Sequence, residues 1–393
     1  MSTKISEMVG SKVKKKHLKP KHQKAKVFRA NEPLLSVFMW GVNHTIGGLT
    51  HVNIPVMLMP DDFKAFSKIR VDNHNFNNSI FRENMPSHFK VKEYCPLVFR
   101  NLRERFRIFE SDYINSLTKS QPIPVNTRNK SGTKLYESHD KMFVIKVLQS
   151  EEVEFMHTLL KQYHPYVVEK HGRTLLPQYL GLYRLTVEGT ETYFLVMRNI
   201  FSSALKVHCN YDLKGTTVDR EASIKEKIKD FPTLKDGDFI QDGCKLHVGS
   251  DQKARLLETL NSDVEFISRF HVTEYSVCVG IHDYQLADEE EEKGDQSDND
   301  DYCDEEGSED SASAVPTPPD SPRIISILVK KDVSPPDPYA FPSSEDSPRR
   351  EMYFIGLVDI LSHGTKKRTA AVTSTQTEQY AKRLVEFMSK AML

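Results

Sequence analysis

The sequence predicts an α+β protein, because helical and strand-like patterns alternate along it. Residues 151–171 and 255–270 carry apolar side chains at spacings of three and four, as amphipathic helices do. Residues 182–187 and 192–197 are strand-like runs on either side of a short glycine turn, which is typical of a hairpin. An acidic and proline-rich stretch, 284–350, separates these patterns from a last strand and helix. We therefore expect one large fold that an insertion interrupts.

Charge is unevenly distributed along the 393 residues. Residues 285–310 hold fourteen acids and one lysine, a net charge of −13, so the rest of the chain carries +12 within an overall net charge of −1. A basic body suggests an anionic partner, either a membrane or a nucleic acid. No recognised nucleic-acid motif accompanies the charge, so we expect no nucleic-acid partner.

The number of cysteines and the hydropathy of the chain indicate the cellular compartment in which we expect the protein. An odd number of cysteines without a CxxC spacing argues against a full disulfide framework and favours reduced thiols in a cytosolic or nuclear protein; they are Cys95, Cys209, Cys244, Cys278 and Cys303. No window reaches the roughly 18 apolar residues that a spanning helix needs. Any association with a membrane is therefore expected to be peripheral.

Residues 1–26 form a basic arm, in which eight lysines from Lys12 to Lys26 face one acid, Glu7. Such an arm is either a solvated, disordered tail or a contact for an anionic membrane, where each basic residue contributes about 1 kcal/mol.

Residues 27–60 combine a helix-like stretch at 35–46 with a strand-like stretch at 52–59. In residues 99–107, helical spacing points Phe99, Leu102 and Phe106 inward and leaves the arginines outside, as a solvated face or as a patch for lipid phosphates.

Residues 206–222 change abruptly from an apolar strand to polar residues. They contain Lys214 beside Gly215, two threonines and then Arg220. A glycine lets the backbone approach a ligand, and cationic heads beside hydroxyls can hold phosphate oxygens. An ordinary loop with a turn glycine and solvated charges is the alternative on physical grounds.

The exact residues of this stretch identify its function more specifically than its charge and polarity do. Tyr211-Asp-Leu-Lys-Gly-Thr216, followed by Arg220-Glu-Ala-Ser223, resembles a signature of the phosphatidylinositol phosphate kinases. Further segments resemble the type II branch of that family, the phosphatidylinositol 5-phosphate 4-kinases: Leu34-Leu-Ser-Val-Phe-Met-Trp-Gly-Val-Asn-His-Thr45, Pro55-Val-Met-Leu-Met-Pro-Asp-Asp-Phe-Lys64, Lys92-Glu-Tyr-Cys-Pro96, Gly280-Ile-His-Asp283 and Glu378-Gln-Tyr-Ala-Lys-Arg383.

The resemblance implies a two-lobed, kinase-like fold with antiparallel sheets around a nucleotide cleft. The expected order of parts is a basic arm (1–26), an N-terminal dimerisation part (27–129), a nucleotide and substrate core (130–283), a disordered insertion (284–350) and a final part (351–393) with a metal-binding strand, an activation loop and a helix. Strands of two subunits, identical or paralogous, would join at the dimer interface. The insertion is either a solvated spacer or a site of regulatory phosphorylation, since prolines follow Thr317, Ser321 and Ser347.

The resemblance also gives roles to residues of the nucleotide part. Lys146 ends a strand-like run and would grip the phosphates of ATP, with GTP left open. Glu152 would pair with this lysine, although a first-turn glutamate also suits a helix N-terminus by itself. The hinge would comprise Arg198, Asn199 and Ile200, with backbone atoms reading the purine edge. A purely structural lysine is the alternative for Lys146.

Asp359 closes a buried apolar run and would bind Mg²⁺ on the nucleotide phosphates, which matches the preference of magnesium for one or two carboxylates. A buried structural aspartate is the alternative. Lys214, Arg220, Lys366 and Lys367 are assigned to anion contacts on the substrate side.

The chain departs from the family pattern at two places. Thr273-Glu274 stands where the family has Met-Asp, so Glu274 is the candidate base, one methylene longer than the family's aspartate. The activation loop is also shorter than in the family and keeps the basic cluster Lys366-Lys-Arg368.

Together these observations predict a lipid kinase that transfers the γ-phosphate of ATP to the 4-hydroxyl of phosphatidylinositol 5-phosphate. It would act in the cytoplasm at anionic membranes, with a nuclear location also open. The alternative is a weakly active or inactive phosphoinositide-binding scaffold of the same family, which both departures would favour.

Overall fold

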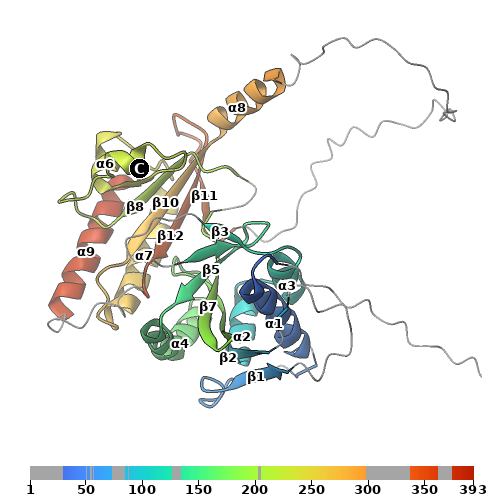
Figure 1. Ribbon diagram of the computed structural model, residues 1–393. Coiled ribbons are helices and arrows are strands. Elements are labelled where there is room, and N and C mark those ends of the chain that lie inside the picture. The colour runs from blue at the N-terminus through green and yellow to red at the C-terminus, as the bar shows by residue number, and fades with distance from the viewer. Residues whose placement is uncertain are drawn as a thin grey trace, which may run out of the picture.

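The computed structural model describes residues 30–49, 51–53, 55, 57–72, 85–86, 88–125, 134–201, 205–297, 337–361 and 374–393. Two β-sheets form two lobes, one above the other in Figure 1. This arrangement confirms the expected α+β, two-lobed fold.

The N-terminal lobe is built on a seven-stranded antiparallel sheet with the order β1-β2-β6-β7-β5-β4-β3. Its strands are β1 (Phe66–Val71), β2 (Phe89–Tyr94), β3 (Ile123–Val125), β4 (Leu135–Glu137), β5 (Phe143–Leu148), β6 (Tyr179–Val187) and β7 (Thr190–Arg198). The helices of this lobe are α1 (Pro33–Leu49), α2 (Pro96–Arg105), α3 (Glu110–Thr118) and α4 (Ser150–Glu169).

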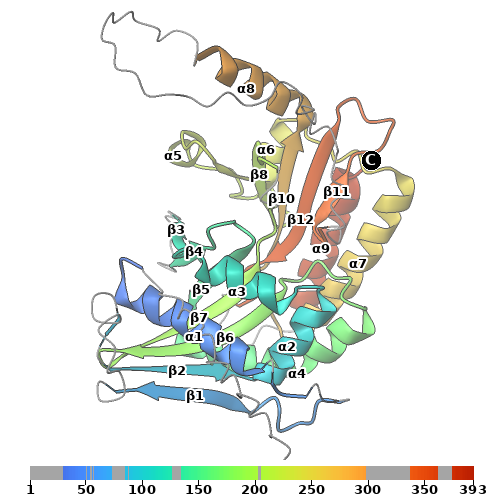
Figure 2. The same cartoon turned by 90° about the vertical axis from the view of Figure 1, so that its right-hand side faces the viewer.

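The C-terminal lobe is built on a five-stranded sheet with the order β11-β12-β10-β8-β9, in which only β8 and β9 run parallel. Its strands are β8 (Cys209–Leu213), β9 (Thr233–Lys235), β10 (Ser276–Asp283), β11 (Ala340–Pro342) and β12 (Glu351–Val358). Its helices are α5 (Ile224–Lys227), α6 (Asp236–Gln241), α7 (Ser250–Ser268), α8 (Tyr284–Ser297) and α9 (Ser374–Ala391). Helices α7 and α9 lie side by side on this lobe (Figure 2).

The amphipathic patterns fold as their spacing predicts. In α4 the side chains at three- and four-residue intervals are buried: Val153, Met156, Leu159, Leu160 and Tyr163. In α7 the buried stripe is Leu256, Leu260, Val264 and Ile267. The hairpin of β6 and β7 turns at Glu188 and Gly189, both with positive φ, a conformation that glycine adopts without strain.

A buried carboxylate joins the lobes. Asp263 of α7 accepts hydrogen bonds from the Tyr166 hydroxyl (2.6 Å), the Thr174 hydroxyl (2.7 Å) and the Leu175 amide (2.6 Å). Burial raises its pKa to about 6. The Leu175 carbonyl accepts a hydrogen bond from the Leu357 amide at 2.7 Å, so the connection continues into β12. This contact fixes β12 relative to the N-terminal lobe.

Two expectations for the N-terminal part are wrong. Residues 52–59 contain no strand where they are described, and the strand of this region, β1, begins only at Phe66. A nearby aspartate turn replaces it, since the Met59 amide donates to Asp62. In α2, Phe99 and Leu102 are buried as expected, but so is Arg103, which donates to the Leu180 carbonyl at 2.7 Å and lies over the Tyr113 ring. A buried acceptor and an aromatic face thus draw one of these arginines inward.

The insertion is shorter than expected at both ends. Residues 284–297 form α8, and residues 337–350 return as an ordered segment that contains β11. The two ends lie close together, because the Tyr284 amide donates to the Arg350 carbonyl and the Arg350 guanidinium lies 4.5 Å over the Tyr284 ring. Thr317 and Ser321 of the phosphorylation hypothesis lie outside the described residues, as does the basic arm.

Candidate functional site

A cavity of about 420 Å³ lies between the two sheets. Residues from β5, α4, the end of β7 and the end of β12 line it. Six residues that the sequence predicted for the site line this one cavity: Lys146, Glu152, Arg198, Asn199, Ile200 and Asp359. These residues lie as much as 213 positions apart in the chain, and the fold brings them together.

Lys146 and Glu152 form an ion pair at 3.1 Å in the wall of the cavity. The strand β5 ends at Leu148 and α4 begins at Ser150, so the two side chains are only six residues apart. Glu152 uses its other carboxylate oxygen to accept a hydrogen bond from the Gln149 amide at 2.9 Å, as part of a capping box. Both roles proposed for Glu152, helix capping and pairing with the lysine, are therefore present at once.

The hinge segment is held by its own side chains. The Asn199 side-chain amide donates to the Lys141 carbonyl at 2.9 Å, and its oxygen accepts from the Phe201 amide at 3.2 Å. The contacts of this side chain thus run to the protein backbone, and the backbone amide of Asn199 donates to the Met142 carbonyl at 2.9 Å. Burial lowers the pKa of Arg198, while the carboxylate of Asp337 opposes the shift.

Asp359 follows directly after β12, with a positive φ of 64°. Asp359 is exposed and lines the cavity, and neighbouring protein partly desolvates its carboxylate. This desolvation raises the pKa of Asp359, an effect that Lys146 opposes and Asp212 reinforces. A carboxyl whose pKa is raised beside a second carboxylate suits a site that a cation neutralises.

Asp212 is a residue that sequence reasoning missed. It lies on β8, and its Oδ2 pairs with Arg220 at 3.0 Å. Its Oδ1 is buried and has no hydrogen-bond partner within the part of the chain that the structure describes. The signal was available, because side chains two apart on a strand share a face, which places Asp212 beside Lys214.

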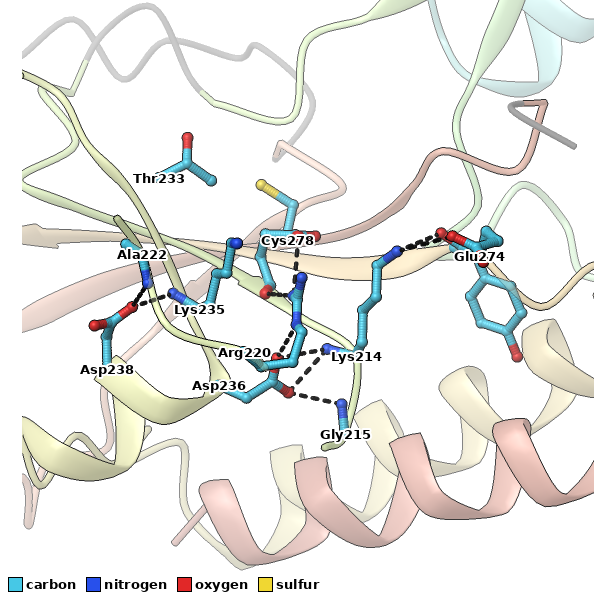
Figure 3. Close-up of polar contacts among 12 residues, drawn as sticks. Lys214, Gly215, Arg220, Ala222, Thr233, Lys235, Asp236, Asp238, Glu274 and Cys278 are labelled. Atoms are coloured by element: carbon cyan, nitrogen blue, oxygen red, sulfur yellow. Dashed lines mark hydrogen bonds and ion pairs between the residues drawn. The ribbon is translucent and has the colours of Figure 1, made fainter. Parts of the chain in front are cut away.

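Arg220 is bound by protein carboxylates. Its Nε pairs at 2.9 Å with Asp236, a fully buried residue, and its Nη2 contacts both the carbonyl and the carboxylate of Asp212. Asp236 also accepts from the backbone amides of Lys214 and Gly215, at 2.9 and 2.7 Å (Figure 3). These contacts fix the shape of the loop, and the substrate role of Arg220 stays a prediction.

Gly215 allows a close contact of the backbone, but its neighbour is a helix and not the ligand that the sequence suggested. Its φ is +75°, and a Cβ at this position would lie 2.8 Å from the Cα of Leu384 in α9. The close neighbour is therefore the backbone of a helix, which packs directly against the loop.

Glu274 lies just before β10 and outside the wall of the cavity. Its side chain is 52% exposed. The Lys214 ammonium donates to the Glu274 carbonyl at 3.0 Å and lies 3.7 Å from its carboxylate (Figure 3). Burial raises the pKa of Asp359, and the charge of Lys214 opposes this rise, so Lys214 acts on the candidate metal ligand as well as on the candidate base. Lys366 and Lys367 lie outside the described residues.

Among the residues that the structure describes, no group of three or more histidine, cysteine, aspartate or glutamate side chains could hold a metal ion. None of the helices there is both long and apolar enough to cross a membrane.

Known proteins are similar to this chain over most of its length. The family model described as phosphatidylinositol-4-phosphate 5-kinase matches residues 116–391, which include every predicted site residue. The chain belongs to this family of phosphatidylinositol phosphate kinases. Within the family, it is 50% identical to the phosphatidylinositol 5-phosphate 4-kinase type-2 alpha of Gallus gallus, over 97% of this chain and 96% of the relative.

Two human kinases of the family give similar values. Identity is 50% to the type-2 alpha enzyme of Homo sapiens, over 96% of this chain and 95% of the relative. It is also 50% to the human type-2 beta enzyme, over 94% and 92%. The similarity therefore extends over nearly the whole of both chains.

Proposed function

We propose that this chain is a lipid kinase that transfers the γ-phosphate of ATP to the 4-hydroxyl of phosphatidylinositol 5-phosphate and so forms phosphatidylinositol 4,5-bisphosphate. The observation that carries the proposal is the convergence of Lys146, Glu152 and Asp359 on one cavity. The similarity to enzymes named phosphatidylinositol 5-phosphate 4-kinases supports the choice of lipid and hydroxyl.

In this proposal Lys146 contacts the nucleotide phosphates, and Glu152 holds the ammonium in place through their 3.1 Å ion pair. The purine lies against the segment from Arg198 to Ile200. Phosphoryl transfer of this kind depends on positioning and charge neutralisation, and not on a covalent intermediate. ATP is the proposed nucleotide, and the same backbone contacts leave GTP as an alternative.

The carboxylates fit a magnesium ion. Asp359 offers a carboxylate open to the cavity, and Asp212 offers a buried oxygen that lacks a partner among the described residues. Magnesium prefers one or two carboxylates together with phosphate oxygens and water. Bound there, it would neutralise the phosphate charge, and the two aspartates would hold it.

Glu274 is the proposed base for the inositol hydroxyl, and Lys214 positions it through the 3.0 Å contact with its carbonyl. In this arrangement the lipid headgroup enters between Glu274 and the cavity that holds the nucleotide. Lys366 and Lys367 would contact the phosphate of the headgroup.

The edge strand β1 supports a proposed dimer. It pairs with β2 on one side, and in the described sheet its other edge carries no strand. An unpaired edge readily adds a strand from a second subunit, identical or paralogous. Sedimentation of the full chain checks the mass of the assembly.

The proposed place of action is the cytoplasmic surface of an anionic membrane.

The decisive experiment compares the wild-type chain with Lys146→Met, using labelled ATP and vesicles that contain phosphatidylinositol 5-phosphate. Loss of the ammonium removes the phosphate contact, so we expect at least about a hundred-fold lower rate in the variant. Thermal unfolding of both proteins controls for folding. Equal incorporation by the two proteins would leave an inactive phosphoinositide-binding scaffold as the better description.

A further inference from the structure

The loop between β8 and β9 carries an exposed apolar surface that the proposed reaction does not explain. Ile224 and Ile228 are 79% and 77% exposed, and Phe231 is 43% exposed. The two isoleucines are four residues apart, at the start of α5 and directly after it, so they lie on one side of this helical turn. We call these three residues the isoleucine ridge.

The ridge is presented by a loop with many internal contacts. Asp238 is buried, accepts from the Ala222 amide at 2.8 Å and pairs with Lys227 at 2.5 Å. Glu226 accepts from the Thr233 amide at 3.2 Å. Asp238 and Glu226 therefore hold the loop in place, while its isoleucines are exposed beside exposed lysines. Apolar exposure on an ordered loop of this kind marks an interaction site.

The position of the ridge relates it to the cavity. The ring of Phe231 packs edge-on against Phe201, with 6.1 Å between centroids, and Phe201 lines the cavity. In Figure 2, α5 projects from the C-terminal lobe on the side where β3 and β4 of the other lobe lie. The same loop begins with Lys214 and contains Arg220, and Asp236 of α6 binds both residues. The ridge therefore lies on the loop that carries two residues predicted for the substrate side.

Lysines alternate with the isoleucines. Lys225 is exposed, and Lys227 and Lys229 are partly exposed while they pair with Asp238 and Glu226. Apolar tips flanked by lysines match the interface of an anionic bilayer, where the tips enter the acyl boundary and the ammonium groups remain among the headgroups.

We propose that the isoleucine ridge inserts into the surface of an anionic bilayer and so holds the cavity against the membrane that contains the lipid substrate. This inference rests on the proposed function, since a lipid substrate is what requires the mouth of the cavity to lie at a bilayer. The ridge acts in binding alone and contributes no group to phosphoryl transfer.

Vesicle flotation without ATP tests the proposal independently of catalysis. The full chain is mixed with vesicles of phosphatidylcholine and phosphatidylserine, and compared with the double variant Ile224→Asp, Ile228→Asp. Insertion of two carboxylates into the interface is unfavourable, so we expect binding to weaken at least about ten-fold. The matched control is Phe109→Asp, because Phe109 is 66% exposed in the other lobe and holds the N-cap position of α3, where aspartate is favoured.

A second measurement separates this proposal from the proposed function. The double variant should phosphorylate a short-chain, soluble phosphatidylinositol 5-phosphate at the wild-type rate and lose at least about ten-fold on vesicles. If the wild-type chain phosphorylates neither substrate, the proposed function fails, but the flotation result still decides the role of the ridge. Equal loss on both substrates in a folded variant would overturn the membrane role.

Direct insertion is observed with Ile228→Trp, since Trp40 is the only other tryptophan in the chain. On addition of anionic vesicles we expect a blue shift of the emission and quenching by brominated lipids. Unchanged emission, or unchanged flotation of the double variant, would overturn the proposal and point to a protein partner for the ridge.

Discussion

At the scale of single residues, side chains of the candidate site also form contacts that hold the fold together. Lys146 and Asp359 were predictable because each follows a recognisable apolar run inside a family motif, although the strand of Lys146 continues to Leu148. Asp212 was not predicted, although its spacing from Lys214 was a signal; the folded chain adds its influence on the pKa of Asp359 and an Oδ1 without a partner among the described atoms. Arg220 was predictable as a cation near anions, but the anions that it contacts belong to the protein.

Glu274 provides the prediction at this scale. Glu274 lies outside the wall of the cavity and is one methylene longer than the aspartate of the family pattern. We expect Glu274→Asp to raise kcat on vesicles about ten-fold, because a shift of about 1 Å in a reacting group can change rates by up to a hundred-fold. The KM for ATP should stay unchanged, since Glu274 does not line the nucleotide cavity. Steady-state kinetics check both values, and Glu274→Gln should lower kcat. An aspartate variant no faster than the wild type would contradict the role of this residue as base.

At the scale of elements, periodicity predicted the long helices and the β6–β7 hairpin, because one side of each packs on the core. It failed for β1, where an edge strand with alternating exposed residues gives a weak apolar signal. It also failed for α8 and β11, because acidic and proline-rich composition outweighed the anchoring contacts at the ends of the insertion. Contacts between distant segments cannot be read from local composition.

The packing of the loop after β8 against α9 is testable through Gly215→Ala. A methyl group would meet the helix backbone at 2.8 Å and would hold a positive φ, so we expect the free energy of unfolding to fall by about 2–4 kcal/mol. Gly189→Ala is the matched control, since Gly189 has a φ of +83° but no atom within 4 Å of the added methyl group. It should cost only about 1 kcal/mol. Urea unfolding measures both, and equal losses would show that the contact with α9 is unimportant.

At the scale of the whole molecule, buried acids make stability depend on pH. Burial raises the pKa of Glu93 from 4.5 to about 7 and that of Asp263 from 3.8 to about 6. The folded protein therefore keeps protons that the unfolded chain has already released at mildly acidic pH. The free energy of unfolding should accordingly fall as pH rises through this range and become level above pH 7.

Glu93→Gln tests this dependence, because glutamine resembles the protonated acid and does not titrate. Between pH 5 and 7 we expect a shallower fall in the free energy of unfolding than in the wild type, and the full contribution of Glu93 is about 3 kcal/mol. Urea unfolding at several pH values measures the slope. Glu154→Gln, an exposed change of the same kind on α4, is the control. Parallel curves for wild type and Glu93→Gln would contradict the prediction.

The contacts between Tyr284 and Arg350 have a consequence for how the segment between them can change during evolution. Strands β10 and β12 pair up to Asp283 and Glu351, so the chain leaves the sheet and re-enters it at neighbouring positions. A closed loop costs only about 0.6 kcal/mol more for each doubling of its length. Substitutions, insertions and deletions in the connecting segment should therefore cost the two lobes little stability. The segment is for this reason a suitable place for new regulatory sites to evolve.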